Sequence, residues 1–211
     1  ISLGINFTIS RGMKNLEKMA NKWEKAIDFR NMTQEEFFSY LDDNNISLDD
    51  LSKVTDWSMV PDLVDYAKYK DVYDNSKYFD QATGDIKWPG QYGDINTDGF
   101  LNGIFENSNL TPGQVIDRYG SNYGTFFADI EASIPERAMA PGSNFDAYNQ
   151  YEILKEIPVR EGIIAPWFNQ PGGGIQYMLD PDFVKTIKSI PGNSEIPFID
   201  ILIDLGYLKR L

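Results

Sequence analysis

The sequence predicts an α+β fold in which a small helical region, residues 1–80, precedes a compact strand-rich domain, residues 81–211. Two patterns lead to this prediction. The first 80 residues carry apolar side chains at helical spacing together with helix-start signals, whereas from Gln114 onward short apolar segments alternate with turn residues. With 211 residues, 42% of them hydrophobic, the chain is long enough for one substantial domain and a smaller helical unit.

Helix-start signals divide the first region into several short helices. Apolar residues recur at helical spacing between charged residues over 13–27. We interpret the region as a helical cap or linker with a core of its own; the alternative is an adaptor surface for a delivery machine or a partner. The later start signals are two capping-box pairs and a proline at a first helical position, namely Thr33 with Glu36, Ser47 with Asp50, and Pro61.

The segment 81–110 is rich in Gly, Asp and Asn. Within it, 94–100 matches the first half of a calcium-binding EF-hand loop. The twelfth position of that loop needs a bidentate glutamate, but Phe105 stands there and Glu106 follows one residue too late. We therefore expect a turn rich in Asn and Asp, with calcium binding as the alternative.

The remaining chain is expected to supply the strands and two more helices. Segments 150–153, 162–165 and 175–179 have strand-like composition. Segments 181–190 and 197–205 have helical patterns, and Gly206 is expected as the glycine that follows the last helix.

Charge and composition exclude several classes of function. The formal net charge is −13, and such an acidic chain has no electrostatic footprint for nucleic acid, although local arginines can still bind a small anion. Without Cys or His the chain cannot form disulfides, Ser-His-Asp or Cys-His sites, or His-ligated metal sites, so we expect no metal. No segment approaches the length of a membrane span, and there is no signal peptide with a basic n-region. Because the sequence opens at Ile1, we expect a fragment of a longer protein.

Three features suggest a binding site, each with an ordinary structural alternative. Arg118, beside aromatic residues and Gly120, is either a phosphate clamp or one half of a structural pair with Asp117. Arg137 stands on a segment stiffened by prolines, which suits a pyrophosphate site or an exposed loop. The run Gly172–Gly174 lacks the spacing of a P-loop or a dinucleotide fingerprint; it allows close backbone approach to a ligand, or forms a flexible turn.

Together these residues resemble the TNT family, the NAD glycohydrolase domains named after the tuberculosis necrotizing toxin. The resemblance covers roughly residues 88–211, and its strength lies in the order of the segments, because each segment alone is weak. The matching segments are 88–89 with 98–100, then 115–120, 137–142, 148–151, 158–166, 169–177 and 202–208.

The resemblance implies an enzyme that hydrolyses NAD, and often NADP, to nicotinamide and ADP-ribose. It implies that Gln176 is the catalytic amide and that Arg118 and Arg137 bind the substrate. Asn149 stands where the founding toxin has a functionally important His, so no imidazole takes part here. The further substrate contacts that we expect are Phe126, Tyr119, Gly173, Gly174 and Asn149.

The chemistry of NAD is compatible with a site that lacks His. Nicotinamide in NAD is already a pyridinium cation, so it leaves as a neutral molecule and needs no general acid, unlike the leaving oxygen of an ordinary glycoside. We expect no cofactor, since NAD is the substrate. The site has to hold the pyrophosphate, orient the ribose and admit one water.

Two other functions remain open from the sequence. An ADP-ribosyltransferase would use the same arginines with a catalytic glutamate, for which Glu131, Glu136 and Glu152 are candidates. A non-enzymatic module with a vestigial site is the second alternative. If the chain is an NAD-cleaving toxin, we expect a cognate immunity protein, secretion from a bacterium, and action in the cytosol of a target cell.

Overall fold

The computed structural model describes residues 33–211, so the helical pattern expected over 13–27 lies outside the described residues. The chain divides into two compact units, one ending at Lys87 and the other comprising Trp88–Leu211. Among the described residues, no helix is long and apolar enough to cross a bilayer.

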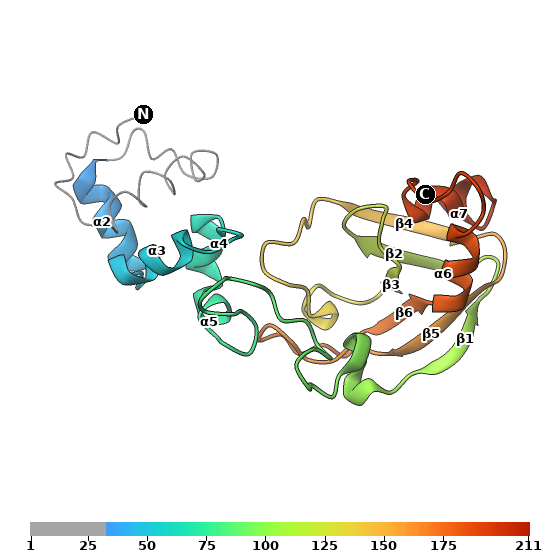
Figure 1. Cartoon of the computed structure of the whole chain (residues 1–211), viewed down its shortest axis with the longest axis horizontal. Helices are drawn as coiled ribbons and strands as arrows, with labels where there is room; N and C mark the ends of the chain where they lie inside the picture. The colour runs from blue at the N-terminus through green and yellow to red at the C-terminus, as the bar shows by residue number, and fades with distance from the viewer. Residues whose placement is uncertain (1–32) are drawn as a thin grey trace. The chain divides into compact units, whose positions relative to one another are not determined.

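The N-terminal unit is helical, and both predicted capping boxes are present at the starts of α2 and α3. The prediction that Pro61 opens a helix is wrong. The helix α4 starts at Leu63, because the side chain of Asp62 accepts hydrogen bonds from the backbone of Val64 and Asp65 and so caps the helix two residues later. The described helices of this unit are α2 (Gln34–Asp43), α3 (Leu48–Thr55), α4 (Leu63–Lys68) and α5 (Lys70–Tyr73) (Figure 1).

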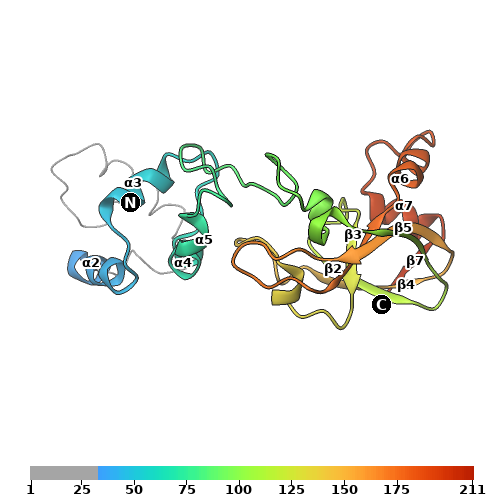
Figure 2. The same ribbon diagram turned by 90° about the horizontal axis from the view of Figure 1, so that it is seen from below.

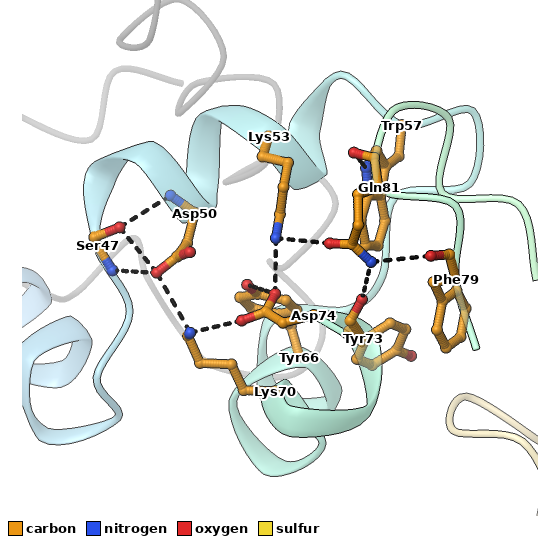
Figure 3. A network of polar contacts seen from close by, with 10 residues as sticks. All are labelled: Ser47, Asp50, Lys53, Trp57, Tyr66, Lys70, Tyr73, Asp74, Phe79 and Gln81. Atoms are coloured by element: carbon orange, nitrogen blue, oxygen red, sulfur yellow. Dashed lines mark hydrogen bonds and ion pairs between the residues drawn. The ribbon is translucent and has the colours of Figure 1, made fainter. Parts of the chain in front are cut away.

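A polar network around Asp74 connects the helices of this unit (Figure 3). The Nζ atoms of Lys53 and Lys70 lie 2.9 and 2.7 Å from the two carboxylate oxygens, and the hydroxyl of Tyr66 donates at 2.7 Å. Lys53 comes from α3, Tyr66 from α4 and Lys70 from α5. Burial alone would raise the pKa of Asp74, but the three donors outweigh it, and the pKa lies below its ordinary value.

The C-terminal unit contains a seven-stranded antiparallel sheet in the order β1-β5-β6-β3-β2-β4-β7 (Figure 1). Together with the preceding helical unit, this confirms the predicted strand-rich α+β class. The strands are β1 (Glu106–Leu110), β2 (Val115–Tyr119), β3 (Phe126–Asp129), β4 (Tyr148–Ile153), β5 (Ile157–Ile163), β6 (Ile175–Leu179) and β7 (Leu208–Arg210).

The helices α6 (Pro181–Lys188) and α7 (Phe198–Asp204) lie together on one side of this sheet (Figures 1 and 2). They enclose the main core with the inward side chains of the strands. Gly206 has φ +73° directly after the last helix, as expected of a terminating glycine. The largest fully buried members of this core are Tyr151, Phe198, Leu110, Ile116 and Ile153.

The strand expected over 162–165 is displaced in the structure. The strand β5 begins at Ile157 and ends at Ile163. Pro158 interrupts the strand pattern in the sequence, but in the structure it pairs with Asn109, and its carbonyl accepts from the backbone of Asp180. The alternation of buried Ile157 and Val159 with a partly exposed residue between them identifies the strand.

The pairing register separates the two faces of the sheet. Phe127 pairs with Tyr177, and both belong to the core under α6 and α7. Successive side chains of a strand point to opposite faces, so Ala128 and its partner Gln176 point to the other face. This other face carries a pocket.

Candidate active site

A pocket of about 650 Å³ opens on the face of the sheet that is not covered by α6 and α7. Its lining includes Gln176 from β6, Arg137 from the 3-10 turn η3 (Pro135–Arg137), and Asp98 from the turn η1 (Thr97–Gly99). The pocket also has five aromatic side chains, which give it broad apolar surfaces for a planar ligand. They are Trp88, Tyr119, Phe126, Trp167 and Phe168.

Gln176 lies in the centre of the sheet, between two neighbours with little or no side chain. Its partner in β5 is Gly162 and its partner in β3 is Ala128. The amide Nε2 of Gln176 donates to the backbone carbonyl of Asp98 at 2.9 Å. This amide therefore has a fixed position at the edge of the pocket.

Arg137 is bound to a buried carboxylate. Its Nη1 and Nη2 atoms lie 2.6 and 2.7 Å from the two oxygens of Asp117, and the two side chains are 6% and 0% exposed. Its Nε donates to the carbonyl of Ala132, and Nη2 also donates to that of Asp129. Four of the five guanidinium N–H groups are thereby used, which leaves one at Nη1 for a ligand. The guanidinium also stacks over Tyr119, with 5.3 Å between Cζ and the ring centroid.

Arg118 lies on a different face from Gln176. In β2 it pairs with Asn149 and follows Asp117, so its side chain starts on the face of Phe127 and Tyr151. The guanidinium lies over the ring of Phe127, with 5.8 Å between Cζ and the centroid. Burial lowers the pKa of this guanidinium.

Two of the buried nitrogens of Arg118, Nε and Nη1, have no hydrogen-bond partner within residues 33–211. The predicted alternative, a pair between Asp117 and Arg118, does not form, because Arg137 occupies both oxygens of Asp117. Gly124 leaves the space for the guanidinium, since a Cβ there would collide with it. Arg118 also borders a smaller hollow of about 130 Å³ that it shares with Phe126, Arg137 and Gln176.

The other predicted contact residues divide between the two faces. Tyr119 and Phe126 line the pocket, and Phe126 remains 41% exposed. Asn149 shares the face of Arg118 and lines neither hollow. Most other residues of the pocket, including Trp88, Trp167 and Phe168, were not identified from the sequence as site residues, since their place in the pocket depends on loop geometry.

The glycine run packs against the protein backbone. A Cβ on Gly172 would come within 2.5 Å of the carbonyl oxygen of Ile164, and one on Gly174 within 3.0 Å of that of Glu136. The backbone N–H of Gly174 donates to this same Glu136 carbonyl. Gly173 has φ +96°, and a Cβ there would meet nothing within 4 Å, but its N–H donates to the carbonyl of Ile164 and the residue lines neither hollow.

The loop with the partial EF-hand pattern is closed by its own hydrogen bonds. The Asp94 carboxylate accepts from the backbone of Gly90 at 2.8 Å and of Asn96 at 3.0 Å. No cluster of three or more acidic residues with metal-site geometry occurs within residues 33–211. These contacts are those of a turn rich in Asn and Asp.

Comparisons with known proteins find similarity in this strand-rich unit. Residues 109–211 match the family described as "Tuberculosis necrotizing toxin". A conidial surface nicotinamide adenine dinucleotide glycohydrolase of Aspergillus fumigatus is 39% identical over 115 residues. That alignment covers 51% of this chain and 42% of the fungal protein, so the chain spans less than half of the relative's length.

Solved structures show weaker similarity. Tuberculosis necrotizing toxin, in complex with its immunity factor, gives a TM-score of 0.45 at 22% identity, over 67% of this chain and 69% of that one. Rhs1-CT, in complex with its cognate immunity protein, gives 0.29 at 18% identity, over 36% and 70%. Both TM-scores are below 0.5, so the geometry of the site comes from this structure alone.

Proposed function

Because residues 109–211 contain a domain of the tuberculosis necrotizing toxin family, we propose that this chain is an NAD glycohydrolase. The observation that carries the proposal is the position of Gln176, which stands at an aromatic-lined pocket of about 650 Å³ with its amide held by the backbone. The identity of 39% with a fungal NAD glycohydrolase supports it.

In the proposed reaction, water replaces nicotinamide at C1′ of the ribose. The bond between C1′ and the pyridinium nitrogen breaks, and its electron pair stays on nicotinamide, which leaves neutral. The water oxygen bonds to C1′, one proton goes to solvent, and ADP-ribose is the second product. Because the leaving group needs no proton, a pocket without His and without a carboxylate pair is sufficient.

The pocket residues suit these tasks. The aromatic rings offer faces that attract the pyridinium cation and the oxocarbenium-like transition state. Arg137 presents its one remaining N–H to the ribose or the pyrophosphate. Two buried nitrogens of Arg118, Nε and Nη1, have no partner within residues 33–211 at the smaller hollow, which supports contact with a phosphate. The positions of Gly173 and Asn149 give no support for substrate contact, since neither residue lines a hollow.

The assay that tests this function is incubation of the purified chain with NAD alone, followed by chromatography of the products. We expect stoichiometric nicotinamide and free ADP-ribose, and we expect NADP to be cleaved as well. Intact NAD after prolonged incubation with folded protein would refute the proposal. The same assay with EDTA examines the cofactor requirement, since activity is expected to persist without metal.

The alternative of ADP-ribose transfer to a protein has no structural support. The three candidate glutamates, Glu131, Glu136 and Glu152, all lie outside the lining of the pocket. A transferase would leave ADP-ribose attached to an added protein acceptor, whereas hydrolysis yields the free product at the same rate without acceptor. Mass spectrometry of the acceptor separates the two reactions.

We further propose that the chain is delivered to the cytosol of a target cell and that its producer makes an immunity protein. An enzyme that removes NAD would deplete the cell that synthesises it unless the pocket is blocked. Expression of the chain alone in bacteria should arrest growth and lower cellular NAD, and co-expression of the small open reading frame next to its gene should restore both. Growth arrest that no neighbouring gene relieves would contradict this part.

A further inference from the structure

The turn Thr97–Gly99 determines which end of the Gln176 amide faces the pocket. The carbonyl oxygen of Asp98 can only accept a hydrogen bond, so the amide group 2.9 Å away must be the donor Nε2. The other end of the amide, Oε1, has no donor among residues 33–211. Oε1 therefore remains for a ligand, together with the second N–H of Nε2, and Oε1 itself can act only as an acceptor.

The sheet has a gap that lets this turn approach Gln176. Gly162 is the neighbour of Gln176 in β5, and a Cβ there would come within 2.7 Å both of Phe100 Cδ1 and of the carbonyl oxygen of Ile104. The segment that follows the turn therefore packs directly on this glycine. Phe100 is fully buried and forms a bridge with Ile164.

The turn is also tied to the sheet through its own backbone. The carbonyl of Gly99 accepts from the backbone N–H of Ala165 at 2.9 Å. Asp98 itself has φ +55° and ψ 20°, a left-handed conformation that Asp and Asn adopt more readily than other side chains. Its carboxylate lies 3.8 Å from Arg160 Nη1, and both side chains are more than a quarter exposed, so this ion pair is weak.

We propose that Asp98 is a positioning residue whose backbone carbonyl orients Gln176, so that Oε1 accepts a hydrogen bond from the ribose or from the attacking water. This inference rests on the proposed NAD glycohydrolysis. Oε1 holds an O–H group in place and does not take its proton. The contribution of Asp98 is its left-handed backbone, which aims the carbonyl, and not its charge.

The chain contains a matched control for this backbone geometry. Asn102, in the next turn η2 (Leu101–Gly103), has φ 56° and ψ 20°, but its carbonyl does not accept from Gln176. Valine is strained in this conformation, so Asp98→Val and Asn102→Val impose the same local strain at two neighbouring turns. Asp98→Asn keeps the backbone preference and removes only the charge.

We expect Asp98→Val to lower kcat about 10- to 100-fold with little change in KM, since a misplaced catalytic group costs rate more than binding. Asn102→Val should keep kcat close to that of the unmodified chain, whereas Asp98→Asn, which keeps the backbone preference, should restore most of the rate that Asp98→Val loses. Equal kcat in the two valine variants would overturn the inference. An Asp98→Asn variant as impaired as Asp98→Val would also overturn it, because the carboxylate would then be the working group.

A second readout does not depend on turnover. In NMR spectra, the side-chain amide protons of Gln176 should exchange slowly in the unmodified chain and in Asn102→Val, and faster in Asp98→Val. Amide protons that exchange fast in the unmodified chain would contradict the contact itself. An unmodified chain that leaves NAD intact would instead refute the proposed function, and the acceptor role with it.

The variant Gln176→Glu tests the acceptor role through its pH profile. A protonated glutamate reproduces the amide, with O–H donating to the Asp98 carbonyl and C=O facing the pocket; an ionised one is repelled by that carbonyl. Activity should therefore rise as the pH falls toward the carboxyl pKa, whose ordinary value is about 4.3. Activity that rises with pH, or that matches Gln176→Met at every pH, would overturn the acceptor role. The charged and titratable groups around this position are Asp98 of η1, Arg160 of β5, Arg137 of η3, and Asp117, Arg118 and Tyr119 of β2.

Discussion

Each unit of the chain contains a carboxylate that binds cationic side chains and one tyrosine hydroxyl, but the two surroundings differ. Asp74 in the helical unit is 26% exposed and binds two lysines together with Tyr66. Asp117 in the sheet is fully buried and binds one bidentate guanidinium together with the hydroxyl of Tyr148. A similar set of ion pairs and hydrogen bonds to a carboxylate therefore occurs once at a partly exposed site and once at a fully buried site.

The difference shows what each network can do. Lysines at the surface of α3 and α5 act as point charges that water and salt screen, so the Asp74 network joins helices at a modest gain. The planar fork of Arg137 fixes both oxygens of Asp117 and, through η3, a wall of the pocket. The carbonyls of this turn then receive the backbone N–H groups of Gly172 and Gly174. The buried network thus positions the strand entry that carries Gln176.

The largest effect is expected from Asp117→Ala. It leaves the buried guanidinium of Arg137 without a counter-charge, with only the carbonyls of Ala132 and Asp129 as acceptors, which costs about 3–5 kcal/mol of unfolding free energy. Chemical denaturation, with hydrogen exchange as the readout, should show the loss of stability in peptides of the sheet. Peptides of the helical unit should be unaffected. Adding Arg137→Met should restore part of the stability; a double variant no more stable than Asp117→Ala would contradict the assignment.

A smaller effect is expected from Asp74→Ala. The two lysines can turn to water, and the main cost is the lost hydrogen bonds to a carboxylate, about 1–3 kcal/mol. Hydrogen exchange should accelerate in peptides of α3, α4 and α5 and stay unchanged in the sheet. A loss as large as that of Asp117→Ala would show that the exposure of Asp74 does not moderate its contribution. Lys87→Ala, a change outside this network in the same unit, serves as the control.

The Asp74 network should also depend on acid. The pKa of Asp74 is lowered from 3.8. The stabilising effect of its ionised form is therefore fully present above about pH 4 and is lost as the pH falls through the lowered pKa. The stability difference between the unmodified chain and Asp74→Asn should therefore shrink below pH 4. A difference that stays constant down to pH 2.5 would mean that the carboxylate is not held ionised by its donors.

The sequence was sufficient for the class of the fold and for the helix starts, because these depend on local spacing. Thr33 with Glu36 and Ser47 with Asp50 form their boxes as the spacing predicts. The sequence was not sufficient for contacts that depend on pairing between distant segments. Nothing local shows that Asp117 pairs with Arg137, 20 residues away, and not with its neighbour Arg118.

The site shows the same division. Gln176 and Phe126 were predicted from resemblance, and the structure places both at one pocket. The role of Asp98 could not be predicted, because it acts through a backbone carbonyl that any residue possesses. The face occupied by Arg118 follows from the register of β2, which a sequence does not fix when both faces carry polar residues.

The smallest expected effects come from removing one tyrosine hydroxyl from each network. The more exposed tyrosine is expected to show the larger loss of stability. Tyr148 is 39% exposed and Tyr66 fully buried, so loss of buried contacts alone would predict a greater cost at Tyr66. The exposure of the carboxylate that accepts the hydroxyl determines the cost instead. Asp117 has no access to water that could replace the hydroxyl, whereas Asp74 has, so Tyr148→Phe should cost about 1.5–3 kcal/mol and Tyr66→Phe about 0.5–1.5. Paired urea titrations, read by hydrogen exchange in each unit, measure both. An equal cost for the two variants would mean that the carboxylates are solvated alike, and would remove the distinction between the two networks.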